Sequence, residues 1–276
     1  MTAGLQRRKE AQRLGDLPAS YEIQTDRIPA LSPTMALVFY LDFLSQPCRA
    51  VYLFAKVNRI PFEVKTVELF RGQHLTDDFA KVNSLKRVPA MKDGDFTLAE
   101  GSAILHYLSQ KYKTPAHWYP PDLQARAWVE EYLSWHADSI RGMFGSMLWI
   151  RVLGPLIDIH IPKEKVDRNI AFMTQSLHHL EQKFLRDKSF LTGDQISVAD
   201  LMALEELMQT FYAGFDVFEG RPKLAAWRGR VEATLGEKLC QETREAIRKL
   251  CAEPKSLKDI PLAMQERMKL RLSKIP

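Results

Sequence analysis

The pattern of apolar and polar residues divides the chain into a mixed first part and a helical second part. Residues 37–41 form a continuous apolar run of strand length, which is typical of a strand buried on both faces. Ser45-Gln46-Pro47 follows and predicts a helix, because Ser suits an N-cap and Pro suits the first turn. Residues 62–67 predict a second strand. This order is a βαβ unit, whose two strands should be parallel.

A hairpin and a helix complete the predicted first domain. Two short strand patterns flank Asp93-Gly94, a dipeptide typical of a type I′ hairpin turn. A helix with one broad apolar face is expected from Glu100 onward. With a loop and a short helix before the hairpin, the order becomes βαβ-α-ββα. That order is a thioredoxin-like α/β arrangement, which we assign to residues 35–113.

The remainder of the chain shows helical patterns and no strand pattern. Three prolines mark residues 114–121 as a linker. Ser197 and Asp200 have the spacing of a helix capping box. We therefore expect an all-helical domain over residues 122–276. Its first two predicted helices cover residues 122–150 and 164–185. A third follows Ser197, a fourth begins at Gly220-Arg221-Pro222, and the last contains the apolar stripe of Met264, Met268 and Leu272.

Charge and composition exclude several classes of protein. The chain of 276 residues has a net charge of +5. Residues 240–276 contribute +4 of this charge, and no basic face interleaved with aromatic residues is present, which argues against nucleic-acid binding. No apolar stretch is long enough to cross a membrane. Residues 1–34 lack the apolar core of a signal peptide and are expected to be a disordered extension.

The three cysteines are too few for a disulfide framework or a four-thiolate zinc site, so we expect a reducing compartment and no metal. Cys48 lies in the first turn of the first predicted helix, where a thiol would ionise easily. A dithiol enzyme of this fold would have its attacking Cys at position 45, which is Ser here. Ser45 is either a plain helix cap or a hydroxyl donor to the thiolate of another molecule. Cys48 is expected to be a small buried apolar residue, with a thiol-disulfide function as the alternative.

Five motifs in both domains resemble the cytosolic glutathione S-transferases of the theta class, and most closely the second theta isoenzyme group. The resemblance extends over residues 35–276 and weakens after about residue 250. It implies a thioredoxin-like glutathione-binding domain followed by an all-helical domain. The matching motifs are residues 41–52, 72–74, 92–98, 135–142 and 199–208.

The resemblance also implies roles for individual residues. Ser45 would be the catalytic hydroxyl that stabilises the glutathione thiolate, and the bond between Val88 and Pro89 would be cis. Asp138 and Arg141 also have the i,i+3 spacing of a surface ion pair, which is the simpler interpretation of the two. The implied glutathione-binding residues are His74, Arg87, Val88, Glu100, Gly101 and Asp138, and the implied second-substrate residues are Gln46, Arg141, Trp149 and Arg271.

Gly101 departs from the family pattern, which has Ser after the Glu at this point. Loss of one hydroxyl hydrogen bond should weaken glutathione binding about two- to tenfold.

The implied activity is conjugation of glutathione to hydrophobic electrophiles, with reduction of organic hydroperoxides and displacement of sulfate esters as related reactions. Glutathione would be a co-substrate, and no other cofactor is expected. A two-fold homodimer in the cytosol is expected, with the nucleus as a second location. The alternative is a non-catalytic ligand carrier of the same fold with a weakened glutathione site.

Overall fold

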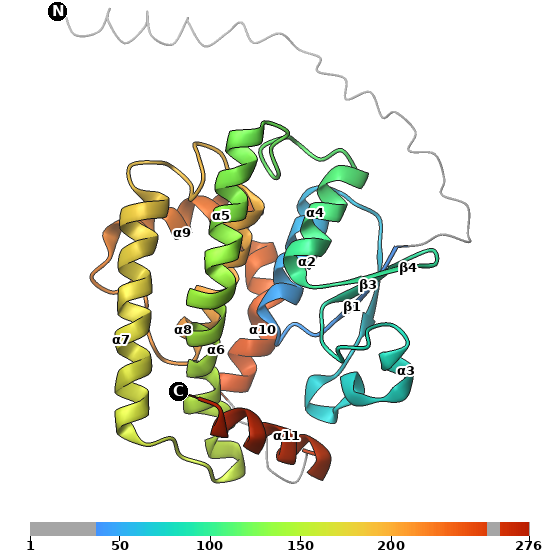
Figure 1. The fold of residues 1–276 in the computed structure, drawn as a ribbon, viewed down its shortest axis with the longest axis vertical. Coiled ribbons are helices and arrows are strands. Elements are labelled where there is room, and N and C mark those ends of the chain that lie inside the picture. The colour runs from blue at the N-terminus through green and yellow to red at the C-terminus, as the bar shows by residue number, and fades with distance from the viewer. Residues whose placement is uncertain (1–36, 253–259, 276) are drawn as a thin grey trace, which may run out of the picture. The chain divides into compact units, whose positions relative to one another are not determined.

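A four-stranded sheet forms the centre of the first domain. The computed structural model describes residues 37–252 and 260–275, which belong to one compact unit (Figure 1). The strand order is β2-β1-β3-β4, with β1 and β2 parallel and the other pairs antiparallel. This confirms the predicted βαβ unit and hairpin. The strands are β1 (Leu37–Leu41), β2 (Glu63–Thr66), β3 (Ala90–Asp93) and β4 (Phe96–Ala99).

Two helices cover the face of the sheet that is directed toward the helical domain (Figure 1). They are α2 (Gln46–Val57) and α4 (Gly101–Lys111). Between β2 and β3 the chain forms two 3₁₀ turns and the short helix α3 (Asp77–Ala80). The predicted fold, a thioredoxin-like domain followed by helices, is therefore confirmed. The expected extension at residues 1–34 lies outside the described residues.

The hairpin turn differs from the predicted type I′. The strands pair as far as Asp93 and Phe96, so the two turn residues are Gly94 and Asp95. Gly94 has a φ of 61°, whereas Asp95 has no positive φ. A type I′ turn needs a positive φ at both central residues, and type II′ needs it only at the first, usually Gly. The turn therefore matches type II′, which also suits the twist of the strands.

The helical domain contains one junction that the sequence pattern missed. The helix predicted over residues 122–150 divides at Ile140, whose φ is −105°. Gly142 and Gly145 lie directly after the junction, and glycine lets a helix bend more easily than other residues do. A π-helical turn (Trp149–Leu153) then ends the segment. The helices are α5 (Leu123–Ser139), α6 (Arg141–Leu148), α7 (Lys163–His179, extended by a π-helical segment to Leu185), α8 (Val198–Tyr212), α9 (Pro222–Leu235), α10 (Glu237–Ala252) and α11 (Leu262–Ser273).

Helix α8 is buried along almost its whole length, from Val198 to Thr210. The predicted capping box is present at its start, where the backbone N–H of Ser197 donates to Asp200 Oδ2 at 2.9 Å. The buried Asp200 carboxylate also accepts hydrogen bonds from the backbone N–H of Leu191 (2.9 Å) and from Trp227 Nε1 (2.8 Å). One side chain therefore connects the start of α8 to the preceding loop and to α9.

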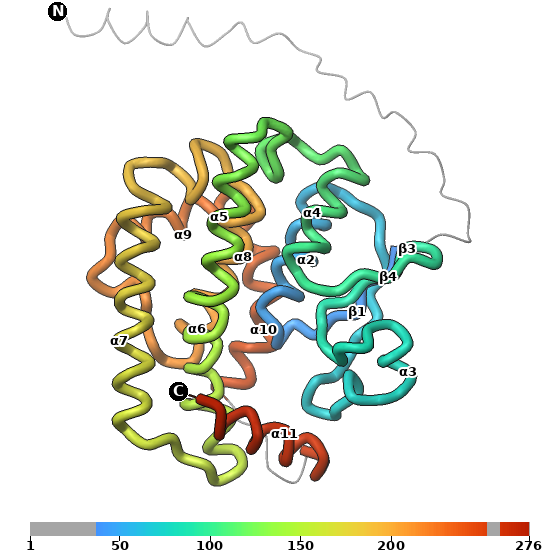
Figure 2. Tube along the Cα trace, in the orientation of Figure 1, coloured from blue at the N-terminus to red at the C-terminus, as the bar shows by residue number. Residues whose placement is uncertain are grey.

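The C-terminal helix α11 confirms the predicted apolar stripe, because Met264, Met268 and Leu272 are all buried. Figure 2 shows α11 below α6, next to the segment that follows β2. The end of the chain is attached to the domain by Lys165, whose Nζ donates to the carbonyl oxygen of Ile275 at 2.7 Å. None of the described helices is long and apolar enough to span a membrane.

Replacing Asp200 with Ala should lower the free energy of unfolding by about 3–5 kcal/mol, because three buried N–H donors would lose their acceptor. Urea denaturation monitored by tryptophan fluorescence would measure the change. Asp187→Ala is the matched control, since that carboxylate is 98% exposed and, among the described residues, is paired with Lys223 alone. Equal stability of the two variants would contradict the assigned role of Asp200.

Candidate functional site

A cavity of about 420 Å³ lies between the first domain and the helical domain. Its wall contains the start of α2, the segments after β2 and before β3, helix α6 with the turn after it, and one face of α11. Of the residues predicted for the site, this wall includes Ser45, Gln46, His74, Arg87, Val88, Arg141, Trp149 and Arg271. The structure thus brings eight of the predicted residues to one cavity.

Ser45 occupies the N-cap position of α2, yet its side chain makes no capping hydrogen bond. The predicted N-cap position of Ser45 is therefore confirmed, whereas the capping hydrogen bond from the helix backbone to its hydroxyl is not observed. That side chain is hydrogen-bonded to the Cys48 thiol instead. It is nearly buried and lines the cavity, where a ligand can reach it.

Cys48 is fully buried, as expected for a small apolar residue. Burial raises the pKa of its thiol to about 12, so the group is protonated at neutral pH. A protonated, inaccessible thiol is a poor nucleophile. The thiol-disulfide alternative therefore has no support from the geometry of Cys48.

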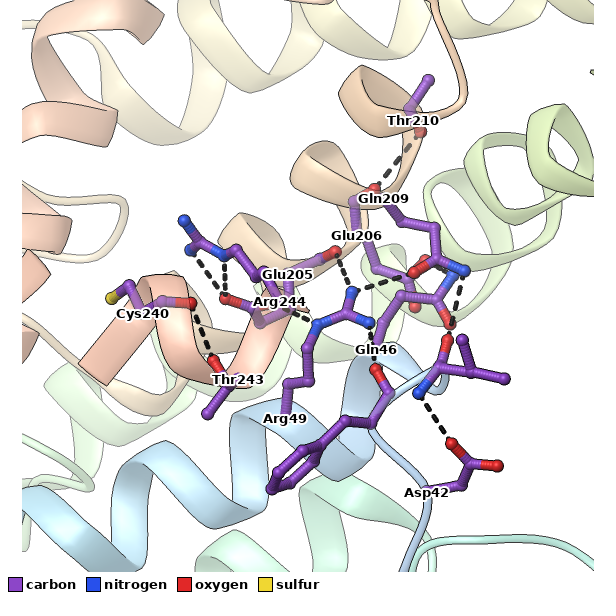
Figure 3. A network of polar contacts seen from close by, with 12 residues as sticks. Asp42, Gln46, Arg49, Glu205, Glu206, Gln209, Thr210, Cys240, Thr243 and Arg244 are labelled. Atoms are coloured by element: carbon purple, nitrogen blue, oxygen red, sulfur yellow. Dashed lines mark hydrogen bonds and ion pairs between the residues drawn. The ribbon is translucent and has the colours of Figure 1, made fainter. Parts of the chain in front are cut away.

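Buried polar side chains connect α2 to α8 and α10 (Figure 3). Glu205 accepts from Arg49 Nε at 2.6 Å and from Arg244 Nη2 at 2.7 Å, and all three side chains are nearly inaccessible. Burial acts to raise the pKa of Glu205, but the two guanidinium groups hold it below its usual value. Arg49 also donates to the carbonyl oxygen of Phe43 (2.7 Å) and to Gln209 Oε1 (2.9 Å). These bonds fix the start of α2, and with it Ser45, against the helical domain.

The next residue on α8, Glu206, organises the cavity wall. Arg141 is ion-paired with the buried Glu206 carboxylate and donates to Gln46 Oε1 at 3.0 Å. Gln46 Nε2 in turn donates to Glu206 Oε2 at 3.0 Å. The expected surface ion pair between Asp138 and Arg141 is not observed among the described residues, because Arg141 is directed to α8 instead.

The predicted glutathione-binding residues fall into two groups. His74, Arg87 and Val88 line the cavity, and the peptide bond between Val88 and Pro89 is cis as expected. The other three, Glu100, Gly101 and Asp138, are not part of the described cavity wall. Glu100 and Asp138 are exposed on the surface, and Glu100 has a φ of 69°.

His74 is 6% exposed, and its Nδ1 has no hydrogen-bond partner among the described residues. Burial, reinforced by the charge of Arg267, lowers the pKa of His74 to about 4. The imidazole is therefore neutral near pH 7.

Gly101 has a packing role that the sequence pattern did not indicate. It begins α4, and a Cβ atom at this position would lie 2.8 Å from Cβ of Pro47 in the first turn of α2. Real Cβ contacts are not this close, and the Pro47 ring cannot rotate away. The absence of a side chain at 101 therefore allows the two helix N-termini to approach each other beside Ser45.

The cavity wall is strongly basic. Its described residues include five basic side chains and no Asp or Glu. Two of the five, Lys86 and Arg267, were missed by the sequence analysis, although Arg267 stands one helical turn before Arg271. The i,i+4 spacing of these two arginines beside the apolar stripe was the signal in the sequence that could have identified Arg267. The five are Lys86, Arg87, Arg141, Arg267 and Arg271.

Within the described residues, no group of three or more His, Cys, Asp or Glu side chains could hold a metal ion.

Replacing Gly101 with Ala should lower the free energy of unfolding by about 1–3 kcal/mol, because the new methyl group would overlap Pro47. Gly229→Ala is the control, since nothing lies within 4 Å of its Cβ position and it sits inside α9. That variant should be unchanged or more stable by up to about 1 kcal/mol. Thermal denaturation of both variants would show whether Gly101 is needed for packing. A Gly101→Ala protein as stable as Gly229→Ala would refute this role.

Comparison with known proteins agrees with the arrangement of the site. The glutathione S-transferase N-terminal domain model matches residues 37–110, and the C-terminal domain model matches residues 148–234. Human glutathione S-transferase theta-2 is 58% identical over 245 residues, which cover 88% of this chain and 100% of that protein. Human glutathione S-transferase theta-1 is 56% identical over 216 residues, which cover 78% of this chain and 90% of that protein.

Solved structures give the same result. Human glutathione transferase theta-2 in complex with glutathione and an unknown ligand superposes with a TM-score of 0.83 at 56% identity, covering 87% of this chain and 100% of that one. A human theta-class enzyme in complex with the glutathione conjugate of 1-menaphthyl sulfate has a TM-score of 0.84 at 56% identity, covering 88% and 100%. Because both domains match and the identity extends along whole relatives, this chain belongs to the theta class of the glutathione S-transferases, a family of glutathione-transferring enzymes.

Proposed function

We propose that this glutathione transferase acts on hydrophobic electrophiles whose leaving group is an anion, above all sulfate esters, and that it also reduces organic hydroperoxides. The observation that carries the proposal is the composition of the cavity wall, which joins Ser45 to five basic side chains without any carboxylate. The apolar part of the wall, with Trp149, Leu148 and Met268, would hold the hydrophobic body of the electrophile.

Ser45 would activate the glutathione thiol. Its hydroxyl makes no capping hydrogen bond to the backbone of α2, and the protonated Cys48 thiol can donate to its oxygen, so the hydroxyl can still donate its own proton to a thiolate at the start of that helix. The unpaired N–H groups of the helix start and the basic wall favour the same negative charge. Both effects lower the pKa of a bound thiol and raise the fraction of thiolate at neutral pH.

For a sulfate ester, the thiolate sulfur attacks the carbon that bears the ester oxygen. A carbon–sulfur bond forms, the carbon–oxygen bond breaks, and sulfate leaves with the electron pair, while the thiol proton goes to solvent. Arg141 and Arg271 would stabilise the departing sulfate. Arg271 is suited to this role, because burial and the charges of Arg141 and Arg87 lower its pKa, and an anion between these groups would relieve their repulsion. The theta-class relative solved with a conjugate of 1-menaphthyl sulfate agrees with this choice of substrate.

For a hydroperoxide, the thiolate attacks the terminal oxygen, the oxygen–oxygen bond breaks, and an alcohol leaves after protonation. A second glutathione then displaces hydroxide from the sulfur, which gives glutathione disulfide and water. This reaction needs Ser45 but no site for a departing sulfate.

Glutathione itself would be held by His74, Arg87 and Val88 at the cavity, with Glu100, Gly101 and Asp138 as further candidates from the family pattern. We also propose a homodimer located in the cytosol, with the nucleus as a second location. A non-catalytic carrier remains the alternative function. The packing of Gly101 against Pro47 gives an explanation of this glycine that does not require loss of catalysis.

Replacing Ser45 with Ala should lower kcat/KM for cumene hydroperoxide and for an aryl-methyl sulfate by about 100-fold, because the thiolate would lose a preorganised donor. The pH profile of the remaining activity should shift upward, since the bound thiol would have a higher pKa. Steady-state kinetics of the full chain from pH 6 to 9 would measure both effects.

Cys48→Ala is the control for the Ser45 experiment, and it should retain most of the activity. Activity that survives in Ser45→Ala and disappears in Cys48→Ala would instead support the thiol-disulfide function. Binding of apolar ligands without turnover by the unmodified protein would support the carrier.

Replacing Arg271 with Gln should lower kcat/KM for the aryl-methyl sulfate about tenfold and leave the hydroperoxide reaction nearly unchanged. The reason is that only the first reaction expels a charged sulfate. Parallel assays with the two substrates would give the ratio of the effects. An equal loss with both substrates would mean that Arg271 acts on glutathione rather than on the leaving group.

A further inference from the structure

Helix α11 presents two cations on one face to the cavity. Met264, Arg267, Met268 and Arg271 all belong to the cavity wall, and their spacing places them on a single helix face. Arg267 and Arg271 are about one turn apart, roughly 6 Å along the helix axis. The buried Met264 and Met268 pack this face against the domain, which fixes the backbone positions of Arg267 and Arg271 beside the cavity.

The two arginines act on different parts of the opposite wall. The charges of Arg141 and Arg87 lower the pKa of Arg271, near the part of the cavity proposed for the leaving group. The charge of Arg267 acts on His74, in the 3₁₀ turn after β2. The helix therefore spans two subsites, one at each of its arginines.

His74 alone cannot neutralise a carboxylate. Its imidazole is buried and uncharged near pH 7, so it can donate one hydrogen bond and contributes no formal charge. Arg267 forms no ion pair or hydrogen bond with another described residue, and no carboxylate of the described wall lies opposite it. Arg267 is exposed to solvent, so its guanidinium group is accessible to an anion at this end of the cavity, and no carboxylate of the described wall competes for it.

We propose that Arg267 binds the glycyl carboxylate of glutathione together with His74, so that α11 contributes to the glutathione site as well as to the electrophile site. The inference rests on the proposed function, in which His74 binds glutathione, and on the family resemblance, which implies that His74 approaches the glycyl carboxylate. Glutathione would then be held by residues from both ends of the chain, and its binding would stabilise the docked position of α11.

The test compares two inhibitors, S-hexylglutathione and its glycyl monoethyl ester, in which an ethyl group replaces the charge of the glycyl carboxylate. Isothermal titration would measure both Kd values for the unmodified full chain, Arg267→Gln and Arg271→Gln. We expect the unmodified protein to bind the free acid about tenfold more tightly than the ester, because a charge-assisted hydrogen bond is lost in the ester. Arg267→Gln should bind the two compounds almost equally, whereas Arg271→Gln should keep the preference.

Arg271→Gln is a matched control, since it removes the same charge from the same helix face and changes the general electrostatic potential equally. Arg267→Lys should keep part of the preference, because a cation remains without the planar geometry of the guanidinium group. Full preference for the acid in Arg267→Gln would overturn the proposal. So would a loss confined to the aryl-methyl sulfate reaction, which would assign Arg267 to the electrophile.

Failure of the proposed function would look different. The unmodified protein would then bind neither inhibitor, or would bind them and turn over neither the sulfate ester nor the hydroperoxide. Binding without turnover, combined with loss of the acid preference in Arg267→Gln, would retain Arg267 as a glutathione ligand in a carrier protein.

Discussion

The buried carboxylate of Glu205 between Arg49 and Arg244 is the constraint on which the site depends. An unpaired charge at this depth would cost several kcal/mol, so the three groups have to meet whenever the chain is folded. Since Arg49 belongs to α2, Glu205 to α8 and Arg244 to α10, this requirement fixes the first domain on the helical domain. Ser45 lies one turn before Arg49, and its position relative to the helical wall of the cavity is thereby determined.

Two consecutive residues of α8 have different roles at the boundary between the two domains. Glu205 faces Arg49 and Arg244 and has no place in the described cavity wall, whereas Glu206 holds Arg141 and Gln46 at that wall. Arg141, which we propose to contact the second substrate, is thus oriented by a carboxylate outside the described cavity wall. This arrangement leaves the described cavity lining free of acidic groups while it still supplies a partner for Arg141.

An acid-free basic cavity has a direct consequence for the choice of ligand. Five cations line the cavity of about 420 Å³, and two of them have carboxylate partners outside its wall, Arg141 with Glu206 and Lys86 with Asp77. Repulsion remains, since burial and the charges of Arg141 and Arg87 lower the pKa of Arg271. Glutathione supplies two carboxylates, one ammonium and, once activated, a thiolate. A neutral electrophile would leave part of the repulsion in place, whereas an electrophile with a sulfate group would relieve it. The charges of the wall thus support the proposed pair of anionic substrates.

Local rules acting within a few residues allowed the sequence by itself to determine the strands, the hairpin, the start of α2 and the capping box at Ser197. Apolar runs, turn dipeptides and caps are such rules, and the motifs around Ser45 identified the family. Only the tertiary structure decided that Arg141 pairs with Glu206 rather than with Asp138, that Gly101 accommodates Pro47, and that the charge of Arg267 acts on His74. Each of these interactions joins residues at least 54 positions apart. Spacing along the chain carries no signal for such pairs, because burial and packing between the two domains select them.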